Sequence, residues 1–90
     1  MDFEWSPAKA AENLRKHKLS FQEGATVFAD PLAYTFPDPE HSVGEVRWLT
    51  FGLSDRRRLL VVSHLEHNDR TRVVSAREAT KHERKVYEES

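Results

Sequence analysis

The 90-residue chain is shorter than the roughly 100–200 residues of a typical domain, so we expect one domain over residues 1–90. With 38% hydrophobic and 10% aromatic residues, its composition excludes a disordered chain. The absence of cysteine excludes disulfides and thiolate metal sites, and no apolar run is long enough to cross a bilayer. These features predict a cytoplasmic protein with no membrane partner.

The charges are distributed unevenly although their sum is only −1. Residues 1–45 hold four Lys or Arg and eight Asp or Glu, whereas residues 46–90 hold ten and seven. Arginine dominates the basic half, and its guanidinium group matches phosphate oxygens with two parallel hydrogen bonds. This pattern indicates a nucleic-acid partner, with solvated strand residues as the alternative interpretation.

Two helices are expected at the start of the chain. Ser6 is placed to cap the first, Pro7 suits its first position, and the helix should run to about His17. Its apolar face is thin and consists of Ala8, Ala11 and Leu14. A capping box at Ser20 and Glu23 begins a second helix, which contains Phe21, Ala25 and Phe28 and stops at Asp30-Pro31.

Strands are expected next, over Leu32–Phe36, Val46–Phe51, Leu59–Leu65 and Arg70–Ser75. The segment 37–44 is a proline-bounded loop, residues 53–58 form a turn, and residues 67–69 make a tight connection. Short connections favour antiparallel pairing, so the last three strands should form a meander.

A final helix is expected from Glu78 to about Glu88, begun by a capping box at Ser75 and Glu78. The fold class is therefore α+β, with two N-terminal helices on an antiparallel sheet of about four strands and a C-terminal helix. The helices cover one face of this sheet. The other face would be free to hold single-stranded RNA.

An ordered series of short motifs adds a family resemblance. Its first half comprises Phe3-Glu4-Trp5-Ser6-Pro7-Ala8-Lys9, Asn13, Lys16-His17, Ser20-Phe21, Glu23, Ala25, Val27-Phe28 and Asp30. Its second half comprises Asp38, His41-Ser42, Glu45, Arg47, Gly52, Arg58-Leu59-Leu60-Val61-Val62, His64, Ser75-Ala76-Arg77, Thr80, Glu83-Arg84 and Tyr87. In this order and spacing the chain resembles the BrnT family over nearly its whole length.

The resemblance implies a RelE-like fold and a ribonuclease activity that blocks translation. It also implies neutralisation by a BrnA-like ribbon-helix-helix antitoxin, whose complex with the toxin binds operator DNA and represses its own operon. Two positions depart from the family pattern. Lys18 stands where a glycine is usual, so the first helix should end in a different backbone conformation, and Val46 stands where a charged residue is common.

RNA cleavage without a metal needs a base, an acid and cations around the phosphate, and arginines can supply the cations. We expect the catalytic residues to be Arg77, Arg47, His64 and Glu45, with Arg77 at the start of the last helix, where the helix dipole attracts an anion. The alternative is that Arg77 pairs with an acid such as Glu45 or Glu83. His64 is the first candidate for acid or base, with a structural histidine as its alternative.

Substrate binding is expected from Arg72, His41 and Tyr87. His41 lies in the proline-bounded loop and competes with His64 as the titrating group, although it could equally cap Glu45 or the turn. Tyr87 could stack on a base or simply pack. The five histidines lack the spacing of a metal site, so we expect neither a metal nor a cofactor.

Three functions remain open on these grounds. The first is an endoribonuclease toxin, and the second is a non-catalytic module of the same fold that binds an antitoxin. The third is a stand-alone RNA-binding domain, which would show strong salt dependence without turnover. Growth arrest with loss of RNA on expression of the chain would favour the first.

Overall fold

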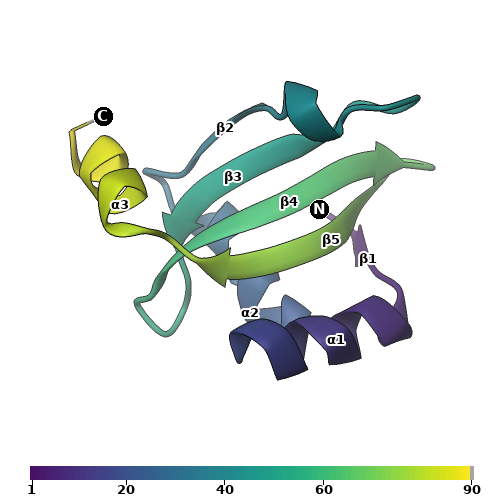
Figure 1. The fold of residues 1–90 in the computed structure, drawn as a ribbon, viewed down its shortest axis with the longest axis horizontal. Coiled ribbons are helices and arrows are strands. Elements are labelled where there is room, and N and C mark those ends of the chain that lie inside the picture. The colour runs from purple at the N-terminus through teal and green to yellow at the C-terminus, as the bar shows by residue number, and fades with distance from the viewer. Residues whose placement is uncertain (90) are drawn as a thin grey trace.

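The structure, a computed structural model that describes residues 1–89, is a mixed five-stranded sheet with helices on both faces (Figure 1). The strand order is β1-β5-β4-β3-β2. The elements are β1 (Phe3–Glu4), α1 (Pro7–His17), α2 (Phe21–Ala25), the 3₁₀ turn η1 (Thr26–Ala29), β2 (Tyr34–Pro37), the 3₁₀ turn η2 (Pro39–His41), β3 (Trp48–Leu53), β4 (Leu59–His67), β5 (Arg70–Glu78) and α3 (Lys81–Glu88).

The predicted α+β class is confirmed, whereas the four-stranded antiparallel sheet is wrong in detail. A fifth strand, β1, pairs in parallel with β5 through Phe3 opposite Thr71 and Glu4 opposite Arg72. Two residues are too few to show the alternation that reveals a strand in a sequence. None of the helices within residues 1–89 has the length and apolarity needed to cross a membrane.

The ends of α1 and the start of α2 follow the expected capping with two differences. The Ser6 and Ser20 hydroxyls accept hydrogen bonds from the Lys9 and Glu23 amides. The Glu23 carboxylate does not return to the cap and instead binds Ser54 and Arg58, so this is not a capping box. Lys18 ends α1 at φ 58°, the left-handed conformation that glycine favours, so the predicted departure there is wrong.

The face that α1 turns to the sheet is not the predicted one. Ala8 and Ala11 are exposed and Leu14 is 53% exposed, whereas Asn13 is buried. The Asn13 amide donates to the carbonyls of Leu19 and Ala76 and accepts from the Ala76 amide. These polar bonds to the edge of β5 outweigh a weak apolar stripe, and they set the rotation of the helix.

The core lies between the sheet and the α2–η1 segment. Its fully buried side chains are Leu19, Phe21, Val27, Leu60, Val62, Val73 and Ala76. Gly52 of β3 lets η1 approach closely, because a Cβ there would stand 3.0 Å from the Val27 carbonyl oxygen. The strongest predicted strand, β4, supplies the centre of this layer.

The β4–β5 hairpin has two special features. Asn68 and Asp69 both have positive φ, at 51° and 63°, which is the pattern of a two-residue type I′ turn. Further along, Ser63 faces Ser75 but His64 faces Val73, so Val74 is an extra residue that forms a β-bulge. The bulge shifts the alternation of β5 by one residue.

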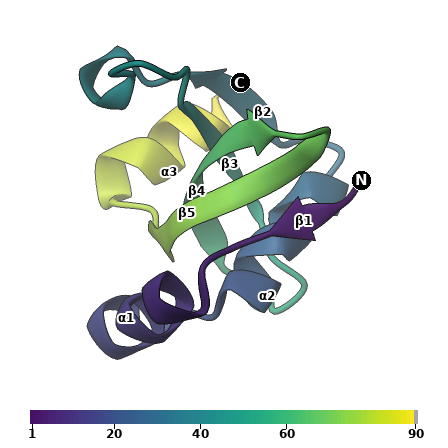
Figure 2. The ribbon, with the colours of Figure 1, turned by 90° about the vertical axis from the view of Figure 1, so that its right-hand side faces the viewer.

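The predicted start of the last helix is wrong. Residues 75–78 continue β5 and pair with Leu60–Ser63, and the capping box that begins α3 is formed by Thr80 and Glu83. α3 lies at one end of the sheet, on the side opposite α2 (Figure 2). There the Tyr87 ring stacks on Tyr34 with ring centroids 6.3 Å apart. The face predicted to be free is therefore covered at one end.

Candidate functional site

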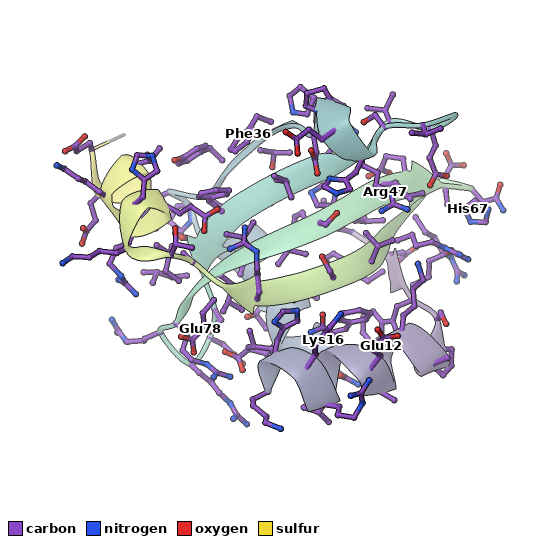
Figure 3. All side chains as sticks on the ribbon, viewed as in Figure 1. Glu12, Lys16, Phe36, Arg47, His67 and Glu78 are labelled. Carbon is purple, nitrogen blue, oxygen red and sulfur yellow. The ribbon has the colours of Figure 1, made fainter. Side chains whose placement is uncertain are left out.

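A basic cavity of about 230 Å³ lies where the sheet ends at the β4–β5 hairpin. Four segments meet here: the start of α1, the residues before β3, the end of β4 and the start of β5. Figure 3 shows Arg47 and His67 at this end of the sheet and Glu78 at the other. The lining residues are Ser6, Lys9, Glu45, Arg47, Leu65, His67, Arg72, Val73 and Val74.

Three of the predicted site residues meet in this basic cavity, namely Glu45, Arg47 and Arg72. Arg47 directly precedes β3, and its backbone is fixed because its amide donates to Ser42 Oγ and its carbonyl accepts from the Asp38 amide. Its Nε is buried and has no hydrogen-bond partner among residues 1–89; a Glu45 oxygen lies 3.7 Å away. The Arg47 guanidinium is therefore held by a long ion pair with Glu45 and, within the described residues, by no hydrogen bond at Nε, which leaves its charge able to attract an anion in the cavity.

Glu4 organises the other side of the basic cavity. Its Oε2 accepts from Arg72 Nε at 2.7 Å and lies 3.0 Å from His67 Nδ1. The hydrogen bond from Arg72 lowers the pKa of Glu4, helped by His67 and opposed by burial, so Glu4 stays ionised. A carboxylate that binds one ring nitrogen fixes the imidazole and leaves its Nε2 for another group, as in catalytic histidine pairs.

The predicted sites did not include Glu4, Lys9 and His67. Glu4 and His67 are 63 positions apart, and no local sequence pattern predicts that β1 brings them together. Lys9 is one of four Lys or Arg residues in the acidic half of the sequence, and only the fold brings it to Arg47 and Arg72.

Arg77 is a strand residue of β5, so its predicted place at a helix start is wrong. Its guanidinium donates two hydrogen bonds to Glu83, at 2.8 and 2.9 Å, which is the acid pairing that the sequence left open. This contact holds the pKa of Glu83 at about 2. Arg77 does not line the basic cavity. The bulge nevertheless puts Arg77 on the same sheet face as Arg72, because their partners on β4, Val61 and Leu65, are four residues apart and so share a face.

His64 lies in the core and is not brought to the basic cavity. Its ring is 5% exposed, packs edge-on against Phe28, and joins a hydrogen-bonded row in which Nε2 is 2.7 Å from Thr50 Oγ1 and Thr50 is 2.6 Å from Thr35. Burial lowers the pKa of His64, so the ring is neutral at pH 7.

Comparison with known proteins connects this geometry to a family. Residues 5–83 match the family model of the ribonuclease toxin BrnT of type II toxin–antitoxin systems. The chain belongs to the BrnT family. The crystal structure of the Brucella abortus ribonuclease toxin BrnT has the same fold, with a TM-score of 0.70 and 21% identity over 90% of this chain and 99% of that chain. The curated proteins contain no match to the sequence.

Membership of the BrnT family makes the chain a toxin of a type II toxin–antitoxin system, from a family of ribonucleases. The two remaining predicted residues of this BrnT-family chain lie outside the basic cavity. His41 Nδ1 is 2.8 Å from Asp38 within the η2 loop, and the Tyr87 hydroxyl donates to Asp30 at 2.6 Å. Within residues 1–89, no group of three or more His, Asp or Glu side chains could hold a metal ion.

Proposed function

We propose that this BrnT-family chain is a metal-independent endoribonuclease, with a RelE-like single domain, whose reaction takes place in the basic cavity. The observation that carries the proposal is the meeting of Arg47 and Arg72 with Glu45 and His67 around one hollow. Two cations, a carboxylate and an imidazole are the groups that transfer of the 2′-oxygen to phosphorus requires.

The chemistry is a transesterification. Glu45 takes the proton of the ribose 2′-hydroxyl while its oxygen attacks phosphorus. The bond from phosphorus to O5′ breaks, and His67 gives a proton to the departing oxygen through Nε2. The products are a 2′,3′-cyclic phosphate and a 5′-hydroxyl, so protons and charge balance without a metal.

The arginines stabilise the charge that grows on the phosphoryl oxygens. Arg47 offers the accessible part of its guanidinium, since its side chain is 30% exposed in the cavity, and Arg72 keeps its terminal nitrogens available while its Nε binds Glu4. Arg77 would contact a further phosphate on the same sheet face, in exchange for Glu83. His41 and Tyr87 would contact flanking nucleotides only after leaving Asp38 and Asp30. His64 serves the core.

The test compares Arg47→Gln with Arg56→Gln. Arg56 is exposed on the β3–β4 turn, so its substitution removes the same charge outside the basic cavity. Loss of the Arg47 contact in the transition state should lower kcat by about 100-fold or more, whereas Arg56→Gln should stay within about twofold. Cleavage of a labelled RNA in EDTA, with the cyclic phosphate identified by mass spectrometry, gives both the rate and the chemistry. Arg77→Gln should raise KM more than it lowers kcat.

Unchanged cleavage by folded Arg47→Gln and Arg72→Gln proteins would remove the basic cavity from the mechanism. Loss of activity in Arg77→Gln alone would move the reaction centre to the α3 end of the sheet.

We also propose that the cellular partners follow the family pattern. The chain would act on RNA in the cytoplasm and inhibit translation, and a BrnA-like ribbon-helix-helix antitoxin would neutralise it. Operator DNA would be bound only through the antitoxin complex. Co-expression with the antitoxin should restore growth, and repression of the operon should require both proteins.

A non-catalytic binding module is the second candidate. The observation in its favour is that two of the arginines, Arg72 and Arg77, already bind acids of the same chain, Glu4 and Glu83. Tight antitoxin binding by a folded protein that leaves RNA intact under all the conditions above would support this candidate.

A further inference from the structure

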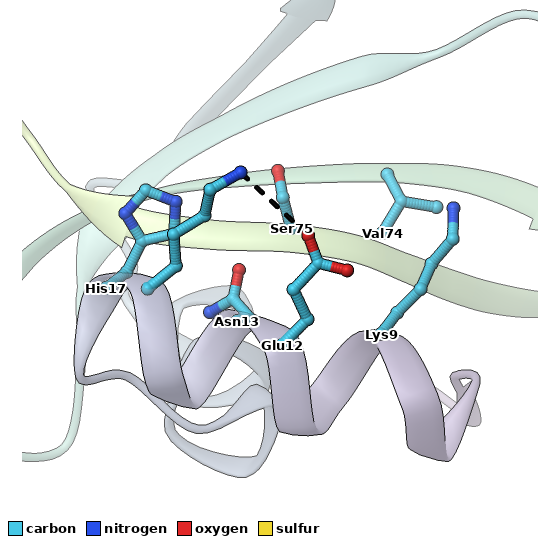
Figure 4. A pocket seen from close by; sticks show the side chains of 7 residues that line it. Lys9, Glu12, Asn13, His17, Val74 and Ser75 are labelled. Atoms are coloured by element: carbon cyan, nitrogen blue, oxygen red, sulfur yellow. Dashed lines mark ion pairs between the residues drawn. The ribbon is translucent and has the colours of Figure 1, made fainter.

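A second hollow, of about 190 Å³, lies between α1 and the edge of β5 (Figure 4) and adjoins the basic cavity. It is lined by Lys9, Glu12, Asn13, Lys16, His17, Val74 and Ser75. Lys9 and Val74 line both hollows. We call the two together the α1–β5 groove; it begins at Arg47 and Arg72 and ends at Lys16 and His17.

The groove exists because the edge of β5 is covered only in part. β1 pairs with Thr71 and Arg72, and Asn13 takes the amide and carbonyl of Ala76. The Thr71 and Ala76 amides both point outward, to Asp2 and Asn13, although they are five residues apart. Successive amides of a strand point to alternate sides, so two amides five residues apart can both point outward only because the Val74 bulge adds one residue. The edge of β5 between Thr71 and Ala76 is left open beside α1.

Cations outnumber acids along the α1–β5 groove. Its lining residues include four Lys or Arg side chains and two carboxylates, together with His17 and His67, and a third carboxylate, Glu4, lies behind Arg72 and His67. Lys9 has no ion pair among residues 1–89. Lys16 meets Glu12 at 3.8 Å with both side chains more than half exposed. Such an exposed pair is weak, so a phosphate could replace Glu12 as the partner of Lys16.

The helix brings these groups onto one line. Lys9, Glu12, Lys16 and His17 stand at positions i, i+3, i+7 and i+8, which is one face of α1. Lys9 and Lys16 are seven residues apart, or about 10 Å along the helix axis. This spacing exceeds the reach of one phosphate group, so the two lysines would bind two different phosphates of one extended strand.

We propose that the α1–β5 groove is a phosphate-binding track for single-stranded RNA that leads into the basic cavity. The proposal rests on the proposed function, because the basic cavity at the end of the track is where the scissile phosphate would lie. Lys9 binds the phosphate next to the reaction centre, and Lys16 with His17 binds a more distant one. The negative charge of Glu12 repels the RNA phosphate until Lys16 leaves its ion pair with Glu12 and binds the phosphate instead.

The experiment measures binding, so it stays informative even if the cavity does not cleave. Two labelled 2′-O-methyl RNAs, an octanucleotide and a dinucleotide, lack the nucleophilic hydroxyl, and their dissociation constants are read by fluorescence anisotropy. Lys16→Gln is compared with Arg15→Gln, an adjacent cation of α1 that does not line the groove. Circular dichroism confirms that each variant is folded.

Lys16→Gln should weaken octanucleotide binding about fivefold, as expected for one charged contact, and leave dinucleotide binding unchanged. For Lys16→Gln, the slope of log affinity against log salt concentration should be shallower than that of the wild type by about 0.7, which corresponds to the loss of one phosphate contact to a single strand. Arg15→Gln should change neither ligand, whereas Lys9→Gln should weaken both.

Equal octanucleotide affinity for Lys16→Gln and the wild type would overturn the track. So would a Lys16→Gln protein that loses affinity for the antitoxin but not for RNA, because the groove would then serve an acidic protein segment. Failure of cleavage with the binding pattern intact would instead overturn only the proposed function.

Discussion

His64 couples the stability of the core to pH. The ring is 5% exposed and meets Phe28, and Nδ1 is buried without a partner within residues 1–89. A proton on Nε2 lets the ring donate to Thr50, Thr50 donate to Thr35, and Thr35 donate to solvent. A second proton would leave a buried charge with no acceptor at Nδ1 within residues 1–89, and the attraction of Glu66 only partly opposes the cost of burial.

We predict that wild-type stability falls as the pH is lowered from 7 to 5.5. Burial lowers the pKa of His64 below its ordinary value of 6.5, so below pH 6.5 the unfolded chain binds a proton that the folded chain refuses. His64→Gln removes this proton and should show a flatter profile over the same range, whatever its absolute stability. Urea unfolding followed by Trp fluorescence measures both slopes, and parallel profiles would show that His64 titrates normally.

Asn13 acts at the scale of elements, because one side chain joins α1, the α1–α2 connection and β5. It is 6% exposed and makes three hydrogen bonds, to the Leu19 carbonyl and to the carbonyl and amide of Ala76. The amide therefore replaces a neighbouring strand at the sheet edge. It also holds Lys9 and Lys16 beside β5, so it positions the α1–β5 groove.

Asn13→Ala should destabilise the fold by about 2–3 kcal/mol, since three buried backbone groups lose their partner and alanine's better helix propensity returns only a few tenths. Glu12→Ala, the exposed neighbour, should change stability by no more than about 0.5 kcal/mol. Chemical denaturation gives the energies, and faster hydrogen exchange of the Ala76 amide locates the effect. An Asn13→Ala protein as stable as the wild type would mean that α1 is held by its apolar contacts.

The elements that could be predicted from the sequence are those with strong local signals. Helix α1 agrees with its capping prediction, and β4 follows an almost continuous aliphatic run. The end of β5 could not be predicted, because Ser75 and Glu78 form as good a capping signal as Thr80 and Glu83, and only pairing with β4 selects between them. The same pairing with β4 determines whether Arg77 lies in a strand or begins a helix.

From the sequence, a residue could be assigned to the candidate site only where the alternation of side chains along a strand is enough to place it. Arg47 directly precedes β3 and Arg72 lies near the start of β5, with β4 between these two strands, and both side chains line the basic cavity. Placing Arg77 on the same face depends on the Val74 bulge, which has no signature in the sequence. The place of Glu4 depends on a two-residue strand whose partners are 68 positions away in the chain, since Phe3 and Glu4 face Thr71 and Arg72.

At the scale of the whole molecule, three segments at the periphery of the fold, β1, α2 and α3, are each tied to the central strands by a carboxylate and an arginine. Glu4 of β1 binds Arg72, Glu23 of α2 binds Arg58 at the start of β4, and Glu83 of α3 binds Arg77. The arginine hydrogen bond is the main cause of the lowered pKa of each carboxyl, which burial opposes in all three cases.

Acid should therefore loosen all three attachments over one pH range. Because the folded-state pKa values lie below the ordinary 4.5, the stability from these pairs is full above about pH 4.5 and is lost as the pH falls, for Glu83 around its pKa of about 2. Glu83→Gln should flatten the acid limb between pH 4 and 2 and free α3, as tested by near-UV circular dichroism and hydrogen exchange in residues 81–88. An unchanged acid limb would mean that Glu83 contributes no pH-dependent attachment, and that α3 is held by the stacking of Tyr87 on Tyr34 and the hydrogen bond of Tyr87 to Asp30.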